Sequence, residues 1–419
     1  LAVHLGSGWY NEDIAFSRWA NPDKQGSTSK RRTLAYGQPS FIAQLEVTYA
    51  DGSQQIIGTD ERWKSHASDI LKEGLFSGEL FDANQSLDGW QHGMTGLEQW
   101  QSVKVLSEWP TQSLEPQLLP PITKVKRVDP VTILQPEQGV WVVDFGQNFT
   151  GVPTLNIAQL NLVPQQMITL RFAEWVDVYG NISMKSGGGA PLLKQVDGYI
   201  ASGRDNATWT PRFTWHGFRY VEIRGLNEAP TLDAIHAHLI RSNVERTGHF
   251  ESSDLLLNRI HETALWGYES NLMSVPMDCP IRERAGWTGD THAAMITGNY
   301  NFDMDNFWRK YLGDFRTATF TAPAVVPGRR THGGKFDWAA AEIMIAWKHY
   351  RHHGDSEVFA KQYESMQEYM QAAESKLDND LLRIGYGDWC DPVVSPGTPR
   401  VGGRCRPQHT TPTQTSSAL

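Results

Sequence analysis

Apolar and polar residues alternate along much of the first 245 residues, as they do in strands that bury one face. Between Phe41 and Tyr49 every second residue is apolar, and the turn Ala50-Asp51-Gly52-Ser53 leads into a second run at 54–59. Asp-Gly accommodates the positive φ of a tight turn, so this stretch predicts a β-hairpin. Similar strand-like runs fall at 140–145, 168–175 and 220–223. Gly and Pro punctuate these runs, which favours β-sandwiches.

The period changes near residue 252, where Ser252-Ser253-Asp254 forms a cluster of helix-capping residues. Apolar residues then recur every four positions, which predicts one buried helical stripe: Leu256, Ile260, Ala264, Tyr268 and Leu272. Further helical patterns fall at 290–300, 303–316, 338–353 and 355–376. Gly354-Asp355 suits the end of one helix and the start of the next. Such tight joints predict stacked antiparallel helical hairpins.

The patterns predict three domains. The paired prolines at 120–121 mark a linker, so we expect an N-terminal β-sandwich over 1–118 and a second β-sandwich over 119–245. Residues 246–419 form the helical domain. The chain of 419 residues, 40% apolar and 20% charged, has enough apolar material for several cores.

Charge and cysteine content exclude some classes of protein. The 38 basic and 47 acidic residues give a net charge of −9, which disfavours nucleic acid as a partner. No apolar run approaches the roughly 18 residues of a membrane helix, so no membrane association is expected. Three cysteines are too few for a disulfide framework and lean toward a reducing, cytoplasmic compartment, although the localisation stays open. Sixteen tryptophans suit sugar rings, but core packing is their ordinary role.

The densest chemistry lies in the thirteen residues from Asp278 to Asp290, which contain three carboxylates, two guanidiniums and an indole. Pro280 and two glycines predict a loop between helices, where functional groups usually lie. Carboxylates this close repel, so one can stay protonated near neutral pH and act as the acid that glycosidic cleavage needs. The alternative is a structural network in which Arg282 and Arg284 hold the two aspartates.

Other motifs add no chemistry. No HExxH or paired CxxC spacing predicts zinc, and His352-His353 is interpreted as a favourable contact with a helix dipole rather than a metal pair. We therefore expect no metal and no cofactor.

The segment 278–290 resembles the active-site loop of α-L-rhamnosidases of glycoside hydrolase family 78. The pattern of that family is D-C-P-x-R-x-E-R-x-G-W-x-G-D. The loop here is one residue shorter than the commonest pattern, so Glu283 follows Arg282 directly. Supporting stretches are 5–10, the 49–52 turn, 144–148, 216–222 and Gly387-Asp388-Trp389. The resemblance covers essentially the whole chain.

This resemblance implies β-sandwich domains followed by an (α/α)6 barrel that is incomplete and truncated at its C-terminus. It implies hydrolysis of terminal non-reducing α-L-rhamnose with inversion, with Glu283 as general acid. The implied sugar-binding residues are Asp278, Arg282, Trp287, Asp290, Trp338 and Trp389. Judged alone, Asp290 could instead cap a helix and each tryptophan could pack in a core.

The general base of an inverting glycosidase is expected beyond residue 419, since about five helical segments are visible where such a barrel needs twelve. We therefore expect a fragment with little activity by itself. Its partners would be rhamnose-containing glycosides or oligosaccharides, and the oligomeric state stays open. Two alternatives are another (α/α)6 inverting glycosidase and a non-catalytic carbohydrate-binding protein.

Overall fold

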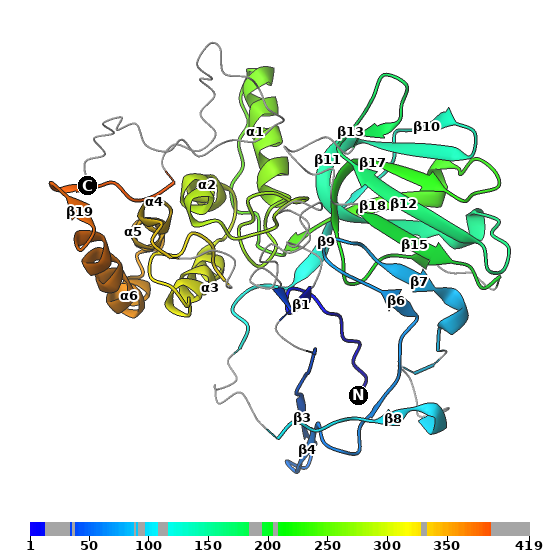
Figure 1. Cartoon of the computed structure of the whole chain (residues 1–419), viewed down its shortest axis with the longest axis horizontal. Coiled ribbons are helices and arrows are strands. Elements are labelled where there is room, and N and C mark those ends of the chain that lie inside the picture. Colours follow the sequence, from blue (N-terminus) through cyan, green and yellow to red (C-terminus); the bar gives the residue numbers. More distant parts are fainter. Residues whose placement is uncertain are drawn as a thin grey trace, which may run out of the picture. The chain divides into compact units, whose positions relative to one another are not determined.

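The computed structural model describes residues 1–12, 34–35, 38–87, 89–90, 97–107, 116–183, 195–203, 208–327 and 333–386. The chain divides into two compact units, one formed mainly by residues up to Ile240 and one mainly by residues from Arg241 onward. The strands of the main sheet lie in the first unit and the helices in the second (Figure 1). The expected change from β to α structure near residue 250 is therefore confirmed.

Short paired strands make up much of the N-terminal region. They are β1 (Asn11–Glu12) with β2 (Leu34–Ala35), β3 (Gln44–Thr48) with β4 (Gln54–Gly58), and β5 (Lys64–Ser65) with β8 (Gln101–Ser102). The β3–β4 pair is the expected hairpin, because Thr48 faces Gln54 across the turn. Asp51 closes that turn by accepting the Ser53 backbone N–H at 2.9 Å, and Gly52 has a φ of +82°.

A ten-stranded sheet forms the main body of the first unit. Its order is β6 (Ile70–Lys72), β7 (Leu80–Asp82), β15 (Val196–Ile200), β12 (Met167–Ala173), β17 (His216–Arg224), β11 (Val140–Asn156), β18 (Ile235–Ser242) and β9 (Ile122–Val128). Two further strands pair with β11, namely β10 (Thr132–Glu137) and β16 (Thr208–Trp209). A separate small pair is β13 (Trp175–Val176) with β14 (Ile182–Ser183). The run expected at 140–145 lies in β11, the one at 220–223 in β17, and most of the one at 168–175 in β12, and these three strands are adjacent in the sheet. The end of the run at 168–175 lies in β13.

The motif at 144–148 bends β11 inside this sheet. Register with β17 shifts between Asp144 and Phe149, and Gly146 has a φ of +71°. Asp144 accepts the Gly146 N–H at 2.6 Å and takes two bonds from the Arg219 guanidinium at 2.7 and 2.8 Å. A two-pronged guanidinium contact of this kind has a defined geometry, so the motif maintains the shape of the sheet.

Aromatic rings fill the core beneath the bend. The Phe218 ring lies with its centroid 4.8 Å from Phe149, 5.1 Å from Phe172 and 5.7 Å from Phe145. All four side chains are at most 2% exposed. Burying such rings supplies much of the free energy that holds a sheet domain together.

Six helices occur among the described residues of the second unit: α1 (Leu255–Glu269), α2 (Thr288–Asn301), α3 (Asp305–Arg316), α4 (Phe336–Ala339), α5 (Ala341–His353) and α6 (Ser356–Glu374). A short hairpin of β19 (Leu377–Asp378) and β20 (Leu381–Leu382) follows. The expected joint is confirmed, because Gly354 ends α5 with a φ of +71° and Asp355 accepts the Glu357 N–H at 2.8 Å. The region expected as one helix over 338–353 is divided into α4 and α5.

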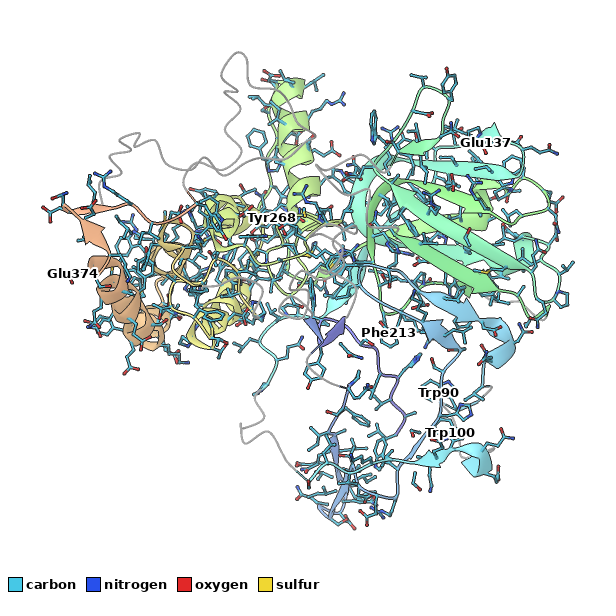
Figure 2. The ribbon with its side chains drawn as sticks, viewed as in Figure 1. Trp90, Trp100, Glu137, Phe213, Tyr268 and Glu374 are labelled. Carbon is cyan, nitrogen blue, oxygen red and sulfur yellow. The ribbon has the colours of Figure 1, made fainter. Side chains whose placement is uncertain are left out.

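The buried stripe expected on α1 is wrong along most of the helix and confirmed only beyond its end, where Leu272 is 1% exposed. Leu256 is 65% exposed and Ile260 55% exposed, and Leu265 is the buried residue of the helix. Contact is made near its end, at Tyr268 (Figure 2). The Tyr268 ring stacks on Phe302 with centroids 6.0 Å apart. Periodicity identifies an apolar face, but burial requires a partner surface, which the described residues do not provide along most of α1.

Helix α3 supplies the centre of the helical core. Its buried side chains are Phe307, Trp308, Tyr311, Leu312 and Phe315. The Trp308 indole donates to Asn299 of α2 at 2.6 Å, so the two helices are joined by a buried hydrogen bond as well as by packing. No described helix has the combination of length and apolar character that crossing a membrane requires.

A buried polar cluster lies next to β7 in the first unit. Glu79 is 1% exposed and accepts the backbone N–H groups of Arg212 and Phe213 at 2.8 and 3.3 Å. Its own N–H donates to Asp197, which lies 3.0 Å from His216. Burial, aided by the charge of Asp197, raises the pKa of Glu79 to about 7, although the two backbone hydrogen bonds and the charge of Arg212 lower it.

The raised pKa of Glu79 predicts that the free energy of unfolding falls as pH rises. The unfolded carboxyl titrates near its ordinary pKa of 4.5 and the folded one near 7, so the folded state binds more protons between these values. The contribution is full below the unfolded pKa and declines by about 3 kcal/mol at most as pH passes through the folded pKa. Glu79→Gln should flatten this dependence in urea unfolding between pH 5 and 8. Glu46→Gln, on the exposed side of β3, is the control, and a slope unchanged by Glu79→Gln contradicts the interpretation.

Candidate functional site

The loop between α1 and α2 is closed by reciprocal hydrogen bonds between Asp278 and Ala285. The Asp278 N–H donates to the Ala285 carbonyl and the Ala285 N–H donates to Asp278 Oδ1, each at 3.0 Å. The Cys279 thiol donates to Asp278 Oδ2 at 3.1 Å and its sulfur accepts the Glu283 N–H at 3.2 Å. Burial raises the pKa of Cys279 to about 12, with the charges of Asp278 and Glu283 adding to the effect, so the thiol stays protonated. Asp278 thereby holds the two ends of the segment 278–285 together.

The two arginines of the loop point to different partners. Arg284 is 1% exposed, adopts a φ of +53° and donates from Nε to the Pro280 carbonyl at 2.8 Å. Arg282 remains partly exposed, and its Nε donates to Glu283 Oε1 at 3.3 Å. Arg284 is thus part of the loop's buried interior, whereas Arg282 contacts the central carboxylate.

Glu283 is held between a guanidinium and an indole. Its Oε2 accepts the Trp287 Nε1–H at 2.7 Å, while Oε1 faces Arg282. The side chain is 14% exposed, so it is largely desolvated yet still reaches the surface. A carboxyl in this environment can exchange a proton with a molecule bound beside it.

The backbone at the end of the loop is fixed by hydrogen bonds at Gly286 and Thr288. The Gly286 carbonyl accepts the Val326 N–H and the Tyr311 hydroxyl, both at 3.0 Å, and the Tyr311 side chain comes from the buried face of α3. The Thr288 N–H donates to the Ala324 carbonyl at 2.9 Å. A Cβ on Gly286 would lie 2.1 Å from the Val326 carbonyl oxygen, so this approach requires glycine.

A second arm of the site comes from residues 335–338 and 385–386. Asp337 accepts the Trp338 N–H at 2.9 Å and the Tyr386 N–H at 2.6 Å, which joins the two segments. The Tyr386 ring then lies edge-on to Trp338 and Trp287, with centroids 5.2 and 6.0 Å away. Lys335 Nζ is 4.5 Å from the centroid of the same ring. Three partly exposed aromatic rings from three stretches of chain therefore form one group, which meets Glu283 through Trp287.

Asp290 connects the loop with this second arm. Helix α2 begins at Thr288, so Asp290 lies in its first turn rather than at the N-cap position. The Trp338 side chain hydrogen bonds to Asp290, which favours the ionised form. Although the residue as a whole is exposed, burial of its carboxylate raises its pKa, and the charge of Glu283 raises it further.

The structure therefore brings together most of the residues selected from the sequence. Glu283, Trp287, Asp290 and Trp338 share one region, with Arg282 on Glu283 and Asp278 closing the loop. Trp389, with the rest of Gly387-Asp388-Trp389, lies outside the described residues. Sequence reasoning missed Lys335, Asp337 and Tyr386. The available signal was their position beside Trp338 and beside the motif at 387–389.

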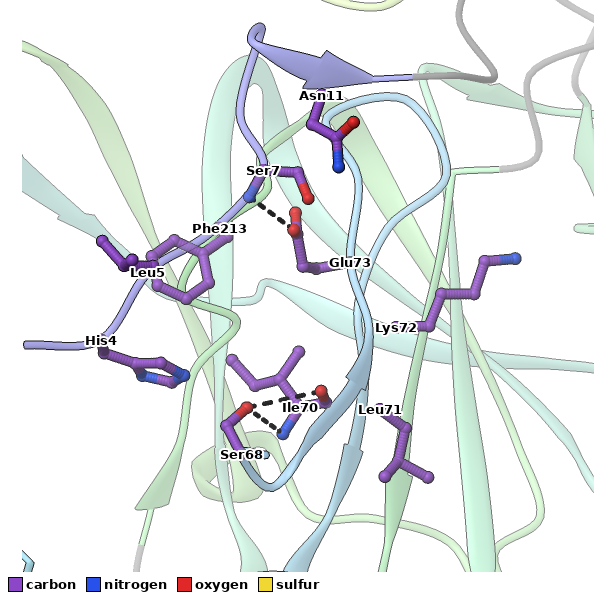
Figure 3. A pocket seen from close by; sticks show the side chains of 10 residues that line it. All are labelled: His4, Leu5, Ser7, Asn11, Ser68, Ile70, Leu71, Lys72, Glu73 and Phe213. Atoms are coloured by element: carbon purple, nitrogen blue, oxygen red, sulfur yellow. Dashed lines mark hydrogen bonds between the residues drawn. The ribbon is translucent and has the colours of Figure 1, made fainter. Parts of the chain in front are cut away.

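Two other features are separate from this residue set. A cavity of about 420 Å³ in the first unit is lined by His4, Leu5, Ser7, Asn11, Ser68, Ile70, Leu71, Lys72, Glu73 and Phe213, with the Ser7 N–H donating to Glu73 at 2.6 Å (Figure 3). Within the described residues, a geometry suited to a metal ion occurs at Asp305, His349 and His353. Neither set includes a residue of the loop.

The helical part, residues 245–410, matches the bacterial alpha-L-rhamnosidase 6 hairpin glycosidase domain. Residues 1–126 match the alpha-L-rhamnosidase N-terminal domain, and residues 134–241 match the bacterial alpha-L-rhamnosidase concanavalin-like domain. The chain belongs to the bacterial α-L-rhamnosidase family.

Relatives over nearly the whole chain agree with this assignment. An alpha-L-rhamnosidase of Formosa agariphila is 32% identical over 94% of this chain, and one of Streptomyces avermitilis 31% over 96%. The solved α-L-rhamnosidase of Dictyoglumus thermophilum matches with a TM-score of 0.77 at 35% identity, covering 84% of this chain and 40% of that one. The Streptomyces avermitilis enzyme complexed with L-rhamnose matches with a TM-score of 0.81 at 29% identity, covering 91% and 36%. This chain spans 42% and 37% of the two curated relatives.

The close approach at Gly286 predicts a steric penalty. Gly286→Ala should lower the free energy of unfolding by more than about 2 kcal/mol, because the new methyl group meets backbone rather than a movable side chain. Gly267→Ala is the matched control, since its Cβ would meet nothing within 4 Å, and alanine inside a helix should stabilise by about 0.5–1 kcal/mol. Thermal unfolding followed by circular dichroism checks both. Equal midpoints for the two variants would contradict the proposed anchoring.

Proposed function

We propose that this chain carries the proton-donating side of an α-L-rhamnosidase active site, which hydrolyses terminal non-reducing α-L-rhamnose with inversion. The observation that carries the proposal is the setting of Glu283, whose Oε2 is bonded to the Trp287 indole at 2.7 Å and which is 14% exposed. Asp290 and the aromatic rings border the same carboxyl. Membership of the family supports rhamnosides as the substrate class.

Glu283 is assigned the role of general acid. Its proton passes to the glycosidic oxygen as the bond from that oxygen to the anomeric carbon breaks, so the leaving group departs as a neutral alcohol. The Trp287 N–H orients the carboxyl by holding one oxygen. Tyr311 and Val326 act only through the loop backbone, because both bond to the Gly286 carbonyl.

The surrounding residues are assigned to sugar binding. Asp290 and Arg282 offer an acceptor and a donor to ring hydroxyl groups, and Asp278 lines the subsite while holding the loop. Trp287 and Trp338 form an apolar wall that suits the methyl group of a 6-deoxy sugar. We add Tyr386 to this wall because its ring touches both indoles, and we retain Trp389 as a further member.

A second carboxylate must activate the water. In inverting enzymes it lies about 6.5–9.5 Å from the acid, on the opposite side of the sugar. We propose that this base belongs to a part of the protein beyond residue 419, because the chain spans only 42% and 37% of the curated relatives that it matches. The chain would then bind rhamnosides better than it cleaves them.

We also propose that domains 1–118 and 119–245 are the β-sandwiches and that 246–419 belongs to the catalytic barrel. The family models that match 1–126, 134–241 and 245–410 support this division.

Removal of the Glu283 carboxyl should lower kcat most for substrates whose leaving group must be protonated as it departs. In the protein extended to the length of its relatives, Glu283→Gln should lower kcat on an alkyl or phenyl α-L-rhamnoside roughly a hundredfold to ten-thousandfold. The loss should be much smaller on a dinitrophenyl rhamnoside, whose leaving group departs without protonation. Initial-rate kinetics on both substrates measure the difference.

Glu262→Gln on the exposed side of α1 is the matched control and should leave both rates unchanged. An equal loss on both substrates would assign Glu283 a role other than acid. Rhamnose binding without turnover by the extended protein would favour a carbohydrate-binding protein, and turnover of another sugar in preference to rhamnose would favour a different inverting glycosidase.

The placement of the base makes a separate prediction. The 419-residue chain should hydrolyse an aryl α-L-rhamnoside at least a thousandfold more slowly than the extended protein, because both carboxylates are needed. Product analysis by NMR should show β-L-rhamnose formed first by the extended protein. A normal rate from the 419-residue chain would overturn the assignment of the base.

A further inference from the structure

A second cluster of ligand-type side chains lies where the start of α3 meets the end of α5. Asp305 is the first residue of α3, and His349 and His353 are four positions apart on α5, so their imidazoles lie on the same face of that helix. One ligand atom from each of the three residues lies within 4.8 Å of the other two. The sequence hides the cluster because Asp305 is 44 positions from His349.

His349 is fully buried and only half engaged. Its Nε2 lies 2.7 Å from Asp305 Oδ1, while its Nδ1 is buried and has no hydrogen-bond partner among the described residues. A neutral imidazole carries one N–H and one lone pair, and both are normally satisfied inside a protein. The ring is therefore fully buried, with one nitrogen that no described residue engages.

Asp305 has a free oxygen on the same site. Both of its bonds, from His349 and from Arg309 Nε at 2.8 Å, reach Oδ1. No described residue bonds to Oδ2. His353 completes the set from the exposed end of α5, with its ring centroid 4.6 Å from that of His349, so the cluster is open to solvent on one side.

The nearby charges leave room for a cation. Arg309 also pairs with Asp355 and, at 4.0 Å, with Glu357, so one guanidinium is shared among three carboxylates. A divalent ion would compensate the remaining charge.

We propose that Asp305, His349 and His353 form a binding site for a divalent transition-metal ion, for which Zn²⁺ is the best match. Two imidazoles and one carboxylate form a usual zinc donor set, whereas Ca²⁺ and Mg²⁺ prefer oxygen alone. Ligand atoms around tetrahedral zinc are about 3.3 Å apart, so no pair would have to close by more than about 1.5 Å. The exposed His353, in the last turn of its helix, can make that movement. The ion would tie α3 to α5, and its fourth position would face solvent.

The test uses the 419-residue chain, freed of any affinity tag and stripped of metal with a chelator. Zn²⁺ is titrated in competition with a chromophoric chelator, and Co²⁺ is added separately because its absorption reports tetrahedral coordination. We expect one Zn²⁺ per chain, a visible Co²⁺ spectrum and a higher thermal midpoint with Zn²⁺ than without. His353→Ala should weaken Zn²⁺ binding at least tenfold, and Asp305→Asn should also weaken it.

His352→Ala is the matched control, because His352 is the exposed neighbour on the same helix and does not belong to the cluster. It should change the affinity less than twofold. Each variant must first show the thermal midpoint of the metal-free parent, which the exposed position of His353 favours. The absence of stoichiometric binding would overturn the site, as would equal losses in His352→Ala and His353→Ala. If Asp305, His349 and Arg309 form only a polar network, no stoichiometric binding of Zn²⁺ is expected.

Discussion

The pair of hydrogen bonds between Asp278 and Ala285 is the constraint on which the site depends. They close the loop at its neck, so the residues between them have little freedom in direction. One of those residues, Arg284, turns into the interior, and another, Glu283, turns toward the surface and the Trp287 indole. A carboxyl held in this way can be an efficient general acid, because proton transfer requires it to lie within hydrogen-bond reach of the acceptor atom.

The second arm repeats the same device with another aspartate. Asp337 accepts backbone N–H groups from Trp338 and Tyr386, and so joins segments almost fifty positions apart. The aromatic wall is then built from rings whose backbones are already fixed. Both aspartates therefore hold backbone segments in place. Sequence reasoning assigned Asp278 to substrate contact and overlooked Asp337.

The sequence predicted the architecture more completely than the packing. The β3–β4 hairpin, the joint at Gly354-Asp355 and the cap of α1 at Asp254 all follow from local turn and capping chemistry, and all are present. The stripe on α1 failed because a four-residue period reports an apolar face and not its partner. The loop 278–290 was recognisable because its chemistry is contiguous, whereas Tyr386 and Lys335 join the site only through contacts at long range.

By itself, the sequence determined the change from strands to helices, the family and the segment that carries the carboxylates, because each is encoded in residues close together along the chain. Tertiary structure alone decided which side chain of that segment is presented and which is buried. It also decided that Tyr386 packs between Trp338 and Trp287, the indole bonded to Glu283, and that Asp305 meets His349. The physical reason is that such contacts depend on how α2, α3 and α5 pack, and packing is a property of many side chains acting together rather than of any short pattern.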